Sequence, residues 1–268
     1  MLRLDGVGYR YAGAQVASIR DIDLTVGDGE VVGLAGASES GKSTVCLVVA
    51  GLAPRTLRGT LSGTISLDGE DIAGWPMHQV AGVVGTLFQD PATQISGVCG
   101  TVFEEVAFSP MNLGSPRDEV LDRTWSALDA LRITDLAPRD PARLSGGQMQ
   151  LVAMAGLLAM RPRHLVLDEP TAQLDPAGTR LVGEAIELLA RRGTSILIAE
   201  QKTDLLARAC SRVVVLDSGS IAIDGPATSV FDDPRLDELG VPLPSELRVR
   251  RALAAGGLPA DAAQRMPA

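Results

Sequence analysis

Residues 36–44 have the types and spacing that hold phosphate groups. They read GASESGKST, a full match to G-x-x-x-x-G-K-[ST], between an apolar run typical of a buried strand and one typical of a helix. The backbone N–H groups of such a loop can face negative charge. We therefore expect Lys42 to reach the β- and γ-phosphates of a nucleotide and Ser43 to bind Mg²⁺. The predicted binding residues are Gly36, Ala37, Ser38, Glu39, Ser40, Gly41, Lys42, Ser43 and Thr44.

A glycine-rich turn that only opens a helix is the alternative for this segment. The chain has 24 basic residues, and only Lys42 and Lys202 among them are lysines. A lysine at the required position by chance is therefore less expected than in an average chain.

Two adjacent acids end a second apolar run, HLVLDEP, at residues 164–170. In open α/β sheets, ligands bind at the carboxyl ends of the strands. We expect Asp168 to hold Mg²⁺ through water and Glu169 to polarise an attacking water molecule. The alternative is a strand whose aspartate only begins a turn.

A third segment, LSGGQ at residues 144–148, precedes a helical run of small and apolar residues. A serine and two glycines at a helix N-terminus offer an anion a hydroxyl, open N–H groups and the positive end of the helix dipole. Ser145 could instead be only an N-cap. The predicted contacts here are Ser145, Gly146, Gly147 and Gln148.

The order and spacing of these three segments resemble the ABC ATPase family. The resemblance implies an α/β fold: a P-loop NTPase of ABC type, with a mostly parallel core sheet, an N-terminal antiparallel β subdomain and a helical lobe. It implies ATP and Mg²⁺ as cofactors and ATP hydrolysis as the activity. It also implies that Ser145 and Gly147 act on the γ-phosphate of a nucleotide held by another subunit.

Further residues match the family one at a time. Tyr11 matches the aromatic residue that stacks on adenine, with Tyr9 as a rival, and Gln89 in TLFQDP matches the glutamine that touches Mg²⁺ or its water. Asp175 in TAQLDP resembles the dimer-interface loop, in which Gln173 is a mild departure from the usual S-A-L-D.

Gln201, which follows the apolar run SILIAE at 195–200, is the larger departure, because most members of the family have there a catalytic histidine that contacts the γ-phosphate and the attacking water. His78 and His164 are the only histidines, and neither can substitute for it by position. A glutamine amide can donate a hydrogen bond but cannot carry the charge of an imidazolium. Slower hydrolysis at this site is therefore one hypothesis, while the intact Glu169 argues against a site that is wholly inactive.

The chain divides into a main domain and an appendage. We predict an ABC ATPase domain at 1–235, with a helical lobe inserted at about 90–160, and a short helical appendage with a frayed end at 236–268. A hairpin bounded by Gly63 and Gly69 is expected in the β-rich N-terminal part.

Composition restricts the function further. The net charge of -9 argues against a generally nucleic-acid-binding surface, so we predict no nucleic-acid partner. The three cysteines are widely separated, which favours buried thiols over a disulfide or zinc site. The longest strongly apolar run, at 151–160, is about half of the roughly 20 residues of a membrane-spanning helix, and the N-terminus does not resemble a secretion signal.

The segment LFQDPATQISGVCGTVFEEVAF, at 87–108, resembles the ATPase subunits of energy-coupling factor transporters for vitamins, cobalt or nickel. This resemblance implies pairing with a second ABC ATPase subunit as a homodimer or heterodimer. It also implies a transmembrane coupling subunit, a membrane substrate-binding subunit and a peripheral position at the cytoplasmic face of the membrane. Two alternatives are a soluble ABC ATPase acting on ribosomes or DNA, and a nucleotide-gated subunit whose own site hydrolyses ATP weakly or not at all.

Overall fold

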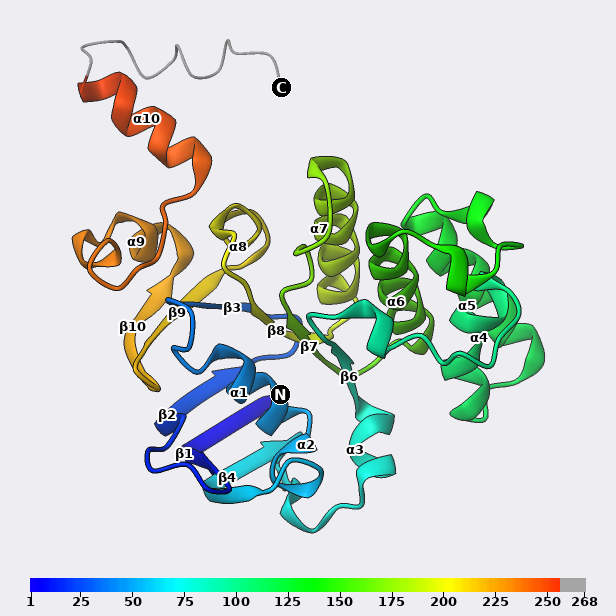
Figure 1. The fold of residues 1–268 in the computed structure, drawn as a ribbon, viewed down its shortest axis with the longest axis horizontal. Helices are drawn as coiled ribbons and strands as arrows, with labels where there is room; N and C mark the ends of the chain where they lie inside the picture. Colours follow the sequence, from blue (N-terminus) through cyan, green and yellow to red (C-terminus); the bar gives the residue numbers. More distant parts are fainter. Residues whose placement is uncertain (256–268) are drawn as a thin grey trace.

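The computed structural model describes residues 1–255, which form two β-sheets surrounded by helices (Figure 1). The strands are β1 Leu2–Tyr11, β2 Ile19–Val26, β3 Val31–Ala35, β4 Gly59–Leu67, β5 Glu70–Asp71, β6 Val84–Leu87, β7 His164–Asp168, β8 Ser195–Ala199, β9 Arg212–Asp217 and β10 Ser220–Pro226. The helices are α1 Lys42–Val49, α2 Leu52–Arg55, α3 Met77–Val83, α4 Val102–Asn112, α5 Arg117–Ala130, α6 Gly146–Met160, α7 Pro176–Arg191, α8 Thr203–Ala209, α9 Ala227–Asp232 and α10 Ser245–Ala255.

The larger sheet has the strand order β10-β9-β3-β8-β7-β6, and all of its pairings except β9 with β10 are parallel. Every residue of β3, β7 and β8 is buried, which accounts for their continuous apolar sequences. The carboxyl ends of these strands, at Ala35, Asp168 and Ala199, lie at one edge of the sheet. The topology therefore brings three loops together there.

Alternate residues of the core strands face different layers. Ile196 and Ile198 belong to the hydrophobic cluster shared with α6, α7 and α8, whereas Leu197 belongs to the cluster shared with α1 and the N-terminal sheet. That sheet is antiparallel, with the order β2-β1-β4-β5. The core sheet is thus covered on both faces, as its apolar strands require.

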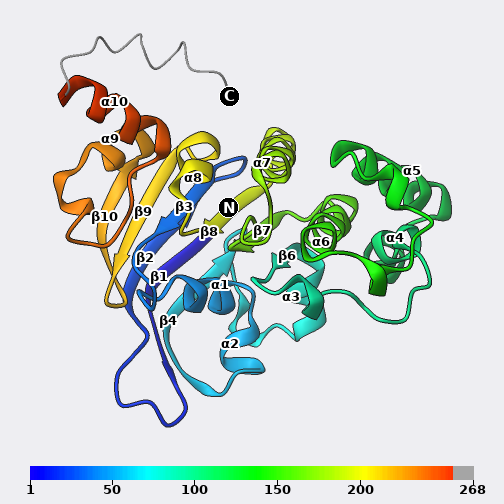
Figure 2. The same ribbon diagram turned by 45° about the horizontal axis from the view of Figure 1, so that its top comes forward.

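Helices α4, α5 and α6 form a lobe at the end of the molecule away from α10 (Figures 1 and 2). Thr101 and Glu104 form a capping box at the start of α4, and Ser145 and Gln148 form another at α6. These helices lie within the stretch predicted for the helical lobe.

The C-terminal segment is tied to the core next to α8. The Thr203 hydroxyl donates to the Pro242 carbonyl oxygen at 2.8 Å, and the backbone N–H of Ser245 donates to Asp204 at 2.6 Å. Helix α10 follows from Ser245. The predicted frayed end lies partly outside the described residues, because the description stops at residue 255.

Two expectations are corrected by this fold. The predicted hairpin forms from β4 and β5 around the turn at Gly69, but Gly63 does not bound it, because β4 begins at Gly59. Gly63, with a φ of 75°, lies instead at an irregularity in the pairing of β4 with β1. Cys99 is half-buried rather than buried, unlike Cys46 and Cys210.

Within residues 1–255, no helix is both long and apolar enough to cross a membrane.

Candidate nucleotide site

The loop between β3 and α1 borders a cleft of about 770 Å³. Helix α1 begins after Gly41, which has a φ of 108° and provides no side-chain cap for the helix. A Cβ at Gly41 would lie 2.8 Å from Ile19 Cγ2, so both the conformation and the packing require glycine. The first turn of α1 lines the cleft through Lys42, Ser43 and Thr44. An uncapped helix N-terminus beside a lysine suits a phosphate chain.

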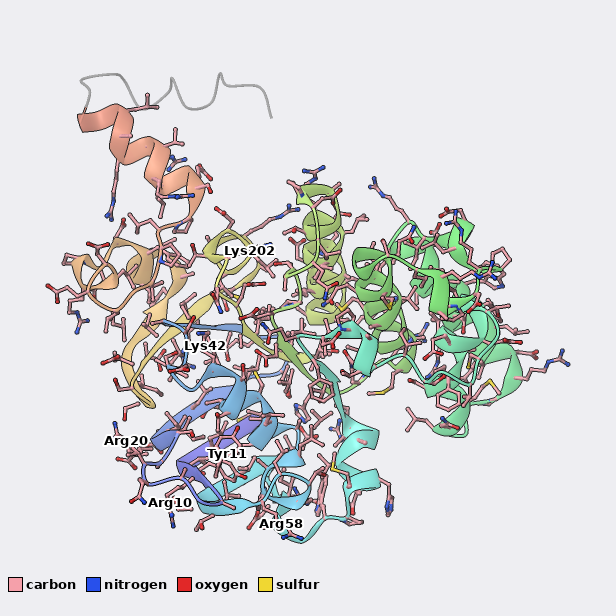
Figure 3. All side chains as sticks on the ribbon, in the orientation of Figure 1. Arg10, Tyr11, Arg20, Lys42, Arg58 and Lys202 are labelled. Atoms are coloured by element: carbon pink, nitrogen blue, oxygen red, sulfur yellow. The ribbon has the colours of Figure 1, made fainter. Side chains whose placement is uncertain are left out.

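Lys42 lies inside this loop and is only 6% exposed. Figure 3 labels this side chain. Its Nζ donates to the carbonyl oxygens of Gly36 at 2.9 Å and Ala37 at 2.8 Å. Burial lowers the pKa of Lys42, while the charges of Glu169 and Asp168 act in the opposite direction. Two backbone carbonyl oxygens of the loop thus hold the ammonium group in place.

Ser43 and Asp168 bring two oxygen ligands together at the floor of the cleft. The Ser43 hydroxyl donates to Asp168 Oδ1 at 3.0 Å. Burial raises the pKa of Asp168, and the Ser43 hydrogen bond only partly offsets this effect. Residues 1–255 contain no cluster of three or more His, Cys, Asp or Glu side chains that is placed to bind a metal ion by itself. A hydroxyl and one carboxylate still fit Mg²⁺, which keeps several waters and binds substrate phosphates.

Both carboxylate oxygens of Glu169 accept a hydrogen bond from a glutamine amide. Gln89 Nε2 donates to Oε2 at 2.8 Å, and Gln201 Nε2 donates to Oε1 at 2.7 Å. Glu169 has a φ of 51°, in the left-handed region, and its backbone N–H donates to the Ala199 carbonyl oxygen at 2.8 Å. The structure therefore brings together three residues that the sequence places far apart, and it holds the carboxylate at the cleft.

The segment LSGGQ does not line this cleft. Ser145 and Gln148 cap α6 reciprocally: Ser145 Oγ accepts from the Gln148 N–H at 3.3 Å, and Gln148 Oε1 accepts from the Ser145 N–H at 3.0 Å. A Cβ at Gly146 would lie 2.0 Å from Gln173 Oε1, so only glycine allows the approach of that side chain. Ser145 therefore does act as the N-cap of α6, as the alternative interpretation of this segment predicted. Any phosphate contact of the segment must be to a nucleotide outside this cleft.

The loop after Glu169 connects the same region to α7. Asp175 Oδ1 accepts from the Gly178 N–H at 2.7 Å and caps α7. Gln150 on α6 is fully buried and donates to the Pro170 carbonyl oxygen at 3.0 Å. The LSGGQ helix is thus hydrogen-bonded to the residue that directly follows the acidic pair.

The two tyrosines differ in environment. Tyr9 is 1% exposed and donates from its hydroxyl to the Leu57 carbonyl oxygen at 2.7 Å, which excludes it as a stacking platform. Tyr11, which Figure 3 labels, is half-buried. Its hydroxyl lies 3.2 Å from Thr44 Oγ1. Its predicted contact with adenine stays a prediction.

Sequence reasoning missed part of the cleft wall. Val16 and Ser18, before β2, line the cleft together with Arg20 and Ser218. The Arg20 guanidinium donates to the Ser218 carbonyl oxygen at 2.7 Å. These residues belong to two distant loops without a recognisable pattern, so no local signal could have identified them.

Comparison with known proteins gives consistent matches. The family model described as ABC transporter matches residues 19–172. A protein of Pyrococcus horikoshii, provisionally named an ABC transporter ATP-binding protein, is 38% identical over 260 residues, which are 96% of this chain and 91% of that protein. A similarly named protein of Streptomyces coelicolor is 38% identical over 237 residues, which cover 87% of this chain but only 42% of that longer protein.

Solved structures agree with the fold. CbiO1 from Clostridium perfringens, described as part of the ABC transporter complex CbiONQ, has a TM-score of 0.77 and 28% identity, with 96% of this chain and 98% of that chain covered. A dimeric ATP-binding cassette bound to ADP and Pi has a TM-score of 0.74 at 22% identity, with 85% and 99% covered, and supports the fold alone. The predicted fold class is confirmed.

Proposed function

Since the chain belongs to the ABC transporter family and is an ATP-binding ATPase subunit of it, we propose that it energises a membrane importer of the energy-coupling factor type. The transported substrate is a vitamin or a transition metal ion in this proposal. Its strongest support is the likeness to CbiO1, whose description places that protein in the complex CbiONQ.

The proposed nucleotide contacts follow the cleft. The β- and γ-phosphates of ATP lie against the N-terminus of α1 and the Lys42 ammonium group, and Tyr11 contacts the adenine. The hydrogen bonds of Lys42 to Gly36 and Ala37 support this assignment, because they hold the cation among the loop amides.

Magnesium, when bound, neutralises phosphate charge and orients the phosphoryl group for in-line attack. Ser43 and Asp168 would hold it, with Gln89 close to its water. Glu169 orients and polarises the attacking water, and the single observation that carries this role is the pair of amides on its two carboxylate oxygens. Such a base contributes about 10²–10⁴-fold to a rate.

Pairing completes the proposed site. The LSGGQ segment does not line the nucleotide cleft of its own subunit. In the proposed pair, Ser145 and Gly147 would therefore contact the γ-phosphate of a nucleotide held by the second ATPase subunit. A coupling subunit and a substrate-binding subunit in the membrane would be the further partners. The chain would then be peripheral, at the cytoplasmic face of the membrane.

A second candidate function rests on Gln201. A neutral amide, rather than an imidazole, contacts Glu169 at 2.7 Å. This favours a nucleotide-gated subunit with a weak site of its own, which supports catalysis in a partner ATPase through its LSGGQ segment.

Co-purification tests the importer proposal. The tagged full chain, expressed in its own cells and extracted from membranes with mild detergent, should retain two different membrane proteins and a second ATPase copy. A Lys42→Ala chain controls for ATP dependence of the assembly. Recovery of the chain with ribosomes or DNA, and without membrane proteins, would refute the importer proposal.

A further inference from the structure

Glu200 is a buried carboxylate beside the nucleotide site that none of the proposed roles uses. It directly follows β8 and is 2% exposed. Within residues 1–255, no ion pair joins it to a cation. An isolated buried charge is costly unless hydrogen bonds compensate it, so the contacts of this side chain indicate what it does.

Three hydrogen bonds converge on the Glu200 carboxylate. Oε2 accepts from the Thr171 hydroxyl at 2.7 Å, a bond that is itself buried. Oε1 accepts from the backbone N–H groups of Gln201 at 2.9 Å and Lys202 at 3.1 Å. The carboxylate therefore bridges the loop after β7 and the loop after β8.

Neighbouring contacts reinforce the same bridge. Lys202 Nζ donates to the Thr171 carbonyl oxygen at 3.1 Å, from the position at the start of α8 shown in Figure 3. The backbone N–H of Glu200 donates to the Leu34 carbonyl oxygen at 3.2 Å, which joins the bridge to the strand that leads into the phosphate loop. Each residue from 200 to 202 thus contacts the segment 169–171 through its side chain, as Gln201 does through Glu169.

We propose that Glu200 is a positioning residue, which joins Thr171 to the backbone of Gln201 so that the Gln201 amide stays on Glu169. This proposal rests on the proposed role of Glu169. Gln201 itself is exposed and lies at the cleft wall, so its own surroundings restrict it little. The Glu200 bridge supplies the missing restraint by fixing the two backbone amides that follow.

Three variants separate positioning from packing. Glu200→Ala leaves the Thr171 hydroxyl and two N–H groups without their acceptor. Thr171→Val removes only the hydroxyl bond to Glu200 and leaves the contact of Lys202 with the Thr171 carbonyl oxygen in place. Glu200→Gln keeps the geometry, because an amide oxygen accepts from both N–H groups and an amide nitrogen donates to the Thr171 hydroxyl. Glu184→Ala, on the exposed side of α7, is the matched control.

The ATPase assay uses the full chain with its partner subunits. We expect Glu200→Ala and Thr171→Val to lower kcat by about tenfold to hundredfold with little change in the KM for ATP, because misplacement of a catalytic group by about 1 Å can cost about a hundredfold. Glu200→Gln should retain most of the wild-type kcat, and Glu184→Ala all of it.

Hydrogen exchange of the nucleotide-free chain gives a readout besides activity. The amides of Gln201 and Lys202 should exchange faster in Glu200→Ala and remain protected in Glu200→Gln. Wild-type kcat in both Glu200→Ala and Thr171→Val, or equal defects in Glu200→Ala and Glu200→Gln, would overturn the positioning role. If Glu200→Ala does not fold, Thr171→Val alone decides.

A Glu169→Gln variant in the same assay separates the two levels of inference. Hydrolysis at the wild-type rate by Glu169→Gln would refute the proposed role of Glu169, whereas the exchange of the Gln201 and Lys202 amides would still test the bridge. A strong loss in Glu169→Gln together with an unaffected Glu200→Ala would refute only the bridge.

Discussion

A substitution of Gln201 is the most direct test of the contacts that hold the Glu169 carboxylate. Its amide donates to Glu169 Oε1 at 2.7 Å, while Gln89 occupies the other oxygen. Gln201→Leu removes the first contact and keeps a side chain of similar size. Gln201→His restores a hydrogen-bond donor that can also carry charge.

The magnitude follows from the kind of bond that is lost. A hydrogen bond to a charged group contributes about 1.5–3 kcal/mol, and each 1.36 kcal/mol in a barrier is about tenfold in rate. Without Gln201, the Glu169 carboxylate would keep only the Gln89 contact within this site. We therefore expect Gln201→Leu to lower kcat by about tenfold to hundredfold.

Gln201→His should raise kcat above wild type and make it dependent on pH. A histidine has a pKa of about 6.5 when unperturbed, and the Glu169 carboxylate beside it would raise this value. The charged imidazole is present below that pKa, so the gain should be largest at mildly acidic pH and decline as the pH rises through it. The wild-type amide does not titrate in this range.

Both variants can be tested by steady-state ATPase rates of the reconstituted complex, measured between about pH 6 and about pH 9 in steps of roughly half a pH unit. ATP binding measured by titration calorimetry controls for lost affinity. Wild-type kcat in Gln201→Leu, together with no gain in Gln201→His, would refute the reasoning and make the contact with Glu169 functionally silent.

Three further predictions concern the rest of the site. Lys42→Ala should weaken Mg-ATP binding by about a hundredfold or more in titration calorimetry, because a buried cation is removed from the phosphates; unchanged affinity would contradict the site. Asp168→Asn should raise the melting temperature of the nucleotide-free chain, because burial raises the pKa of Asp168 and the ionised carboxylate therefore costs stability. The difference in melting temperature between the variant and the wild type should shrink as the pH falls below the raised pKa of Asp168, because the carboxyl group is then protonated in the folded chain. A difference that does not change with pH would contradict this explanation. Ser145→Arg should lower the ATPase rate of the paired complex by about a hundredfold but leave ATP affinity of the isolated chain unchanged, since Ser145 does not line its own cleft; an equal loss of affinity would show that it acts in its own site.

Strong local signals made much of the fold predictable. The strands β3, β7 and β8 are continuous apolar runs because both faces of the core sheet are covered. The capping box of α6 could be recognised from Ser145 and Gln148, three residues apart. A local signal was misleading at Gly63, because this glycine marks an irregularity inside β4 and not the end of the strand.

The sequence by itself determined the phosphate loop and the acidic pair, because the required groups are neighbours along the chain at fixed spacing. Only the tertiary structure decided that Gln89 and Gln201 meet on Glu169, and that Tyr9 is buried while Tyr11 approaches Thr44. The parallel pairing of β6, β7 and β8 brings the loops that carry Gln89, Glu169 and Gln201 to one edge of the sheet. Periodicity along a chain identifies a strand and its faces, but not which strand lies beside it, and that neighbour selects the contacts of each loop.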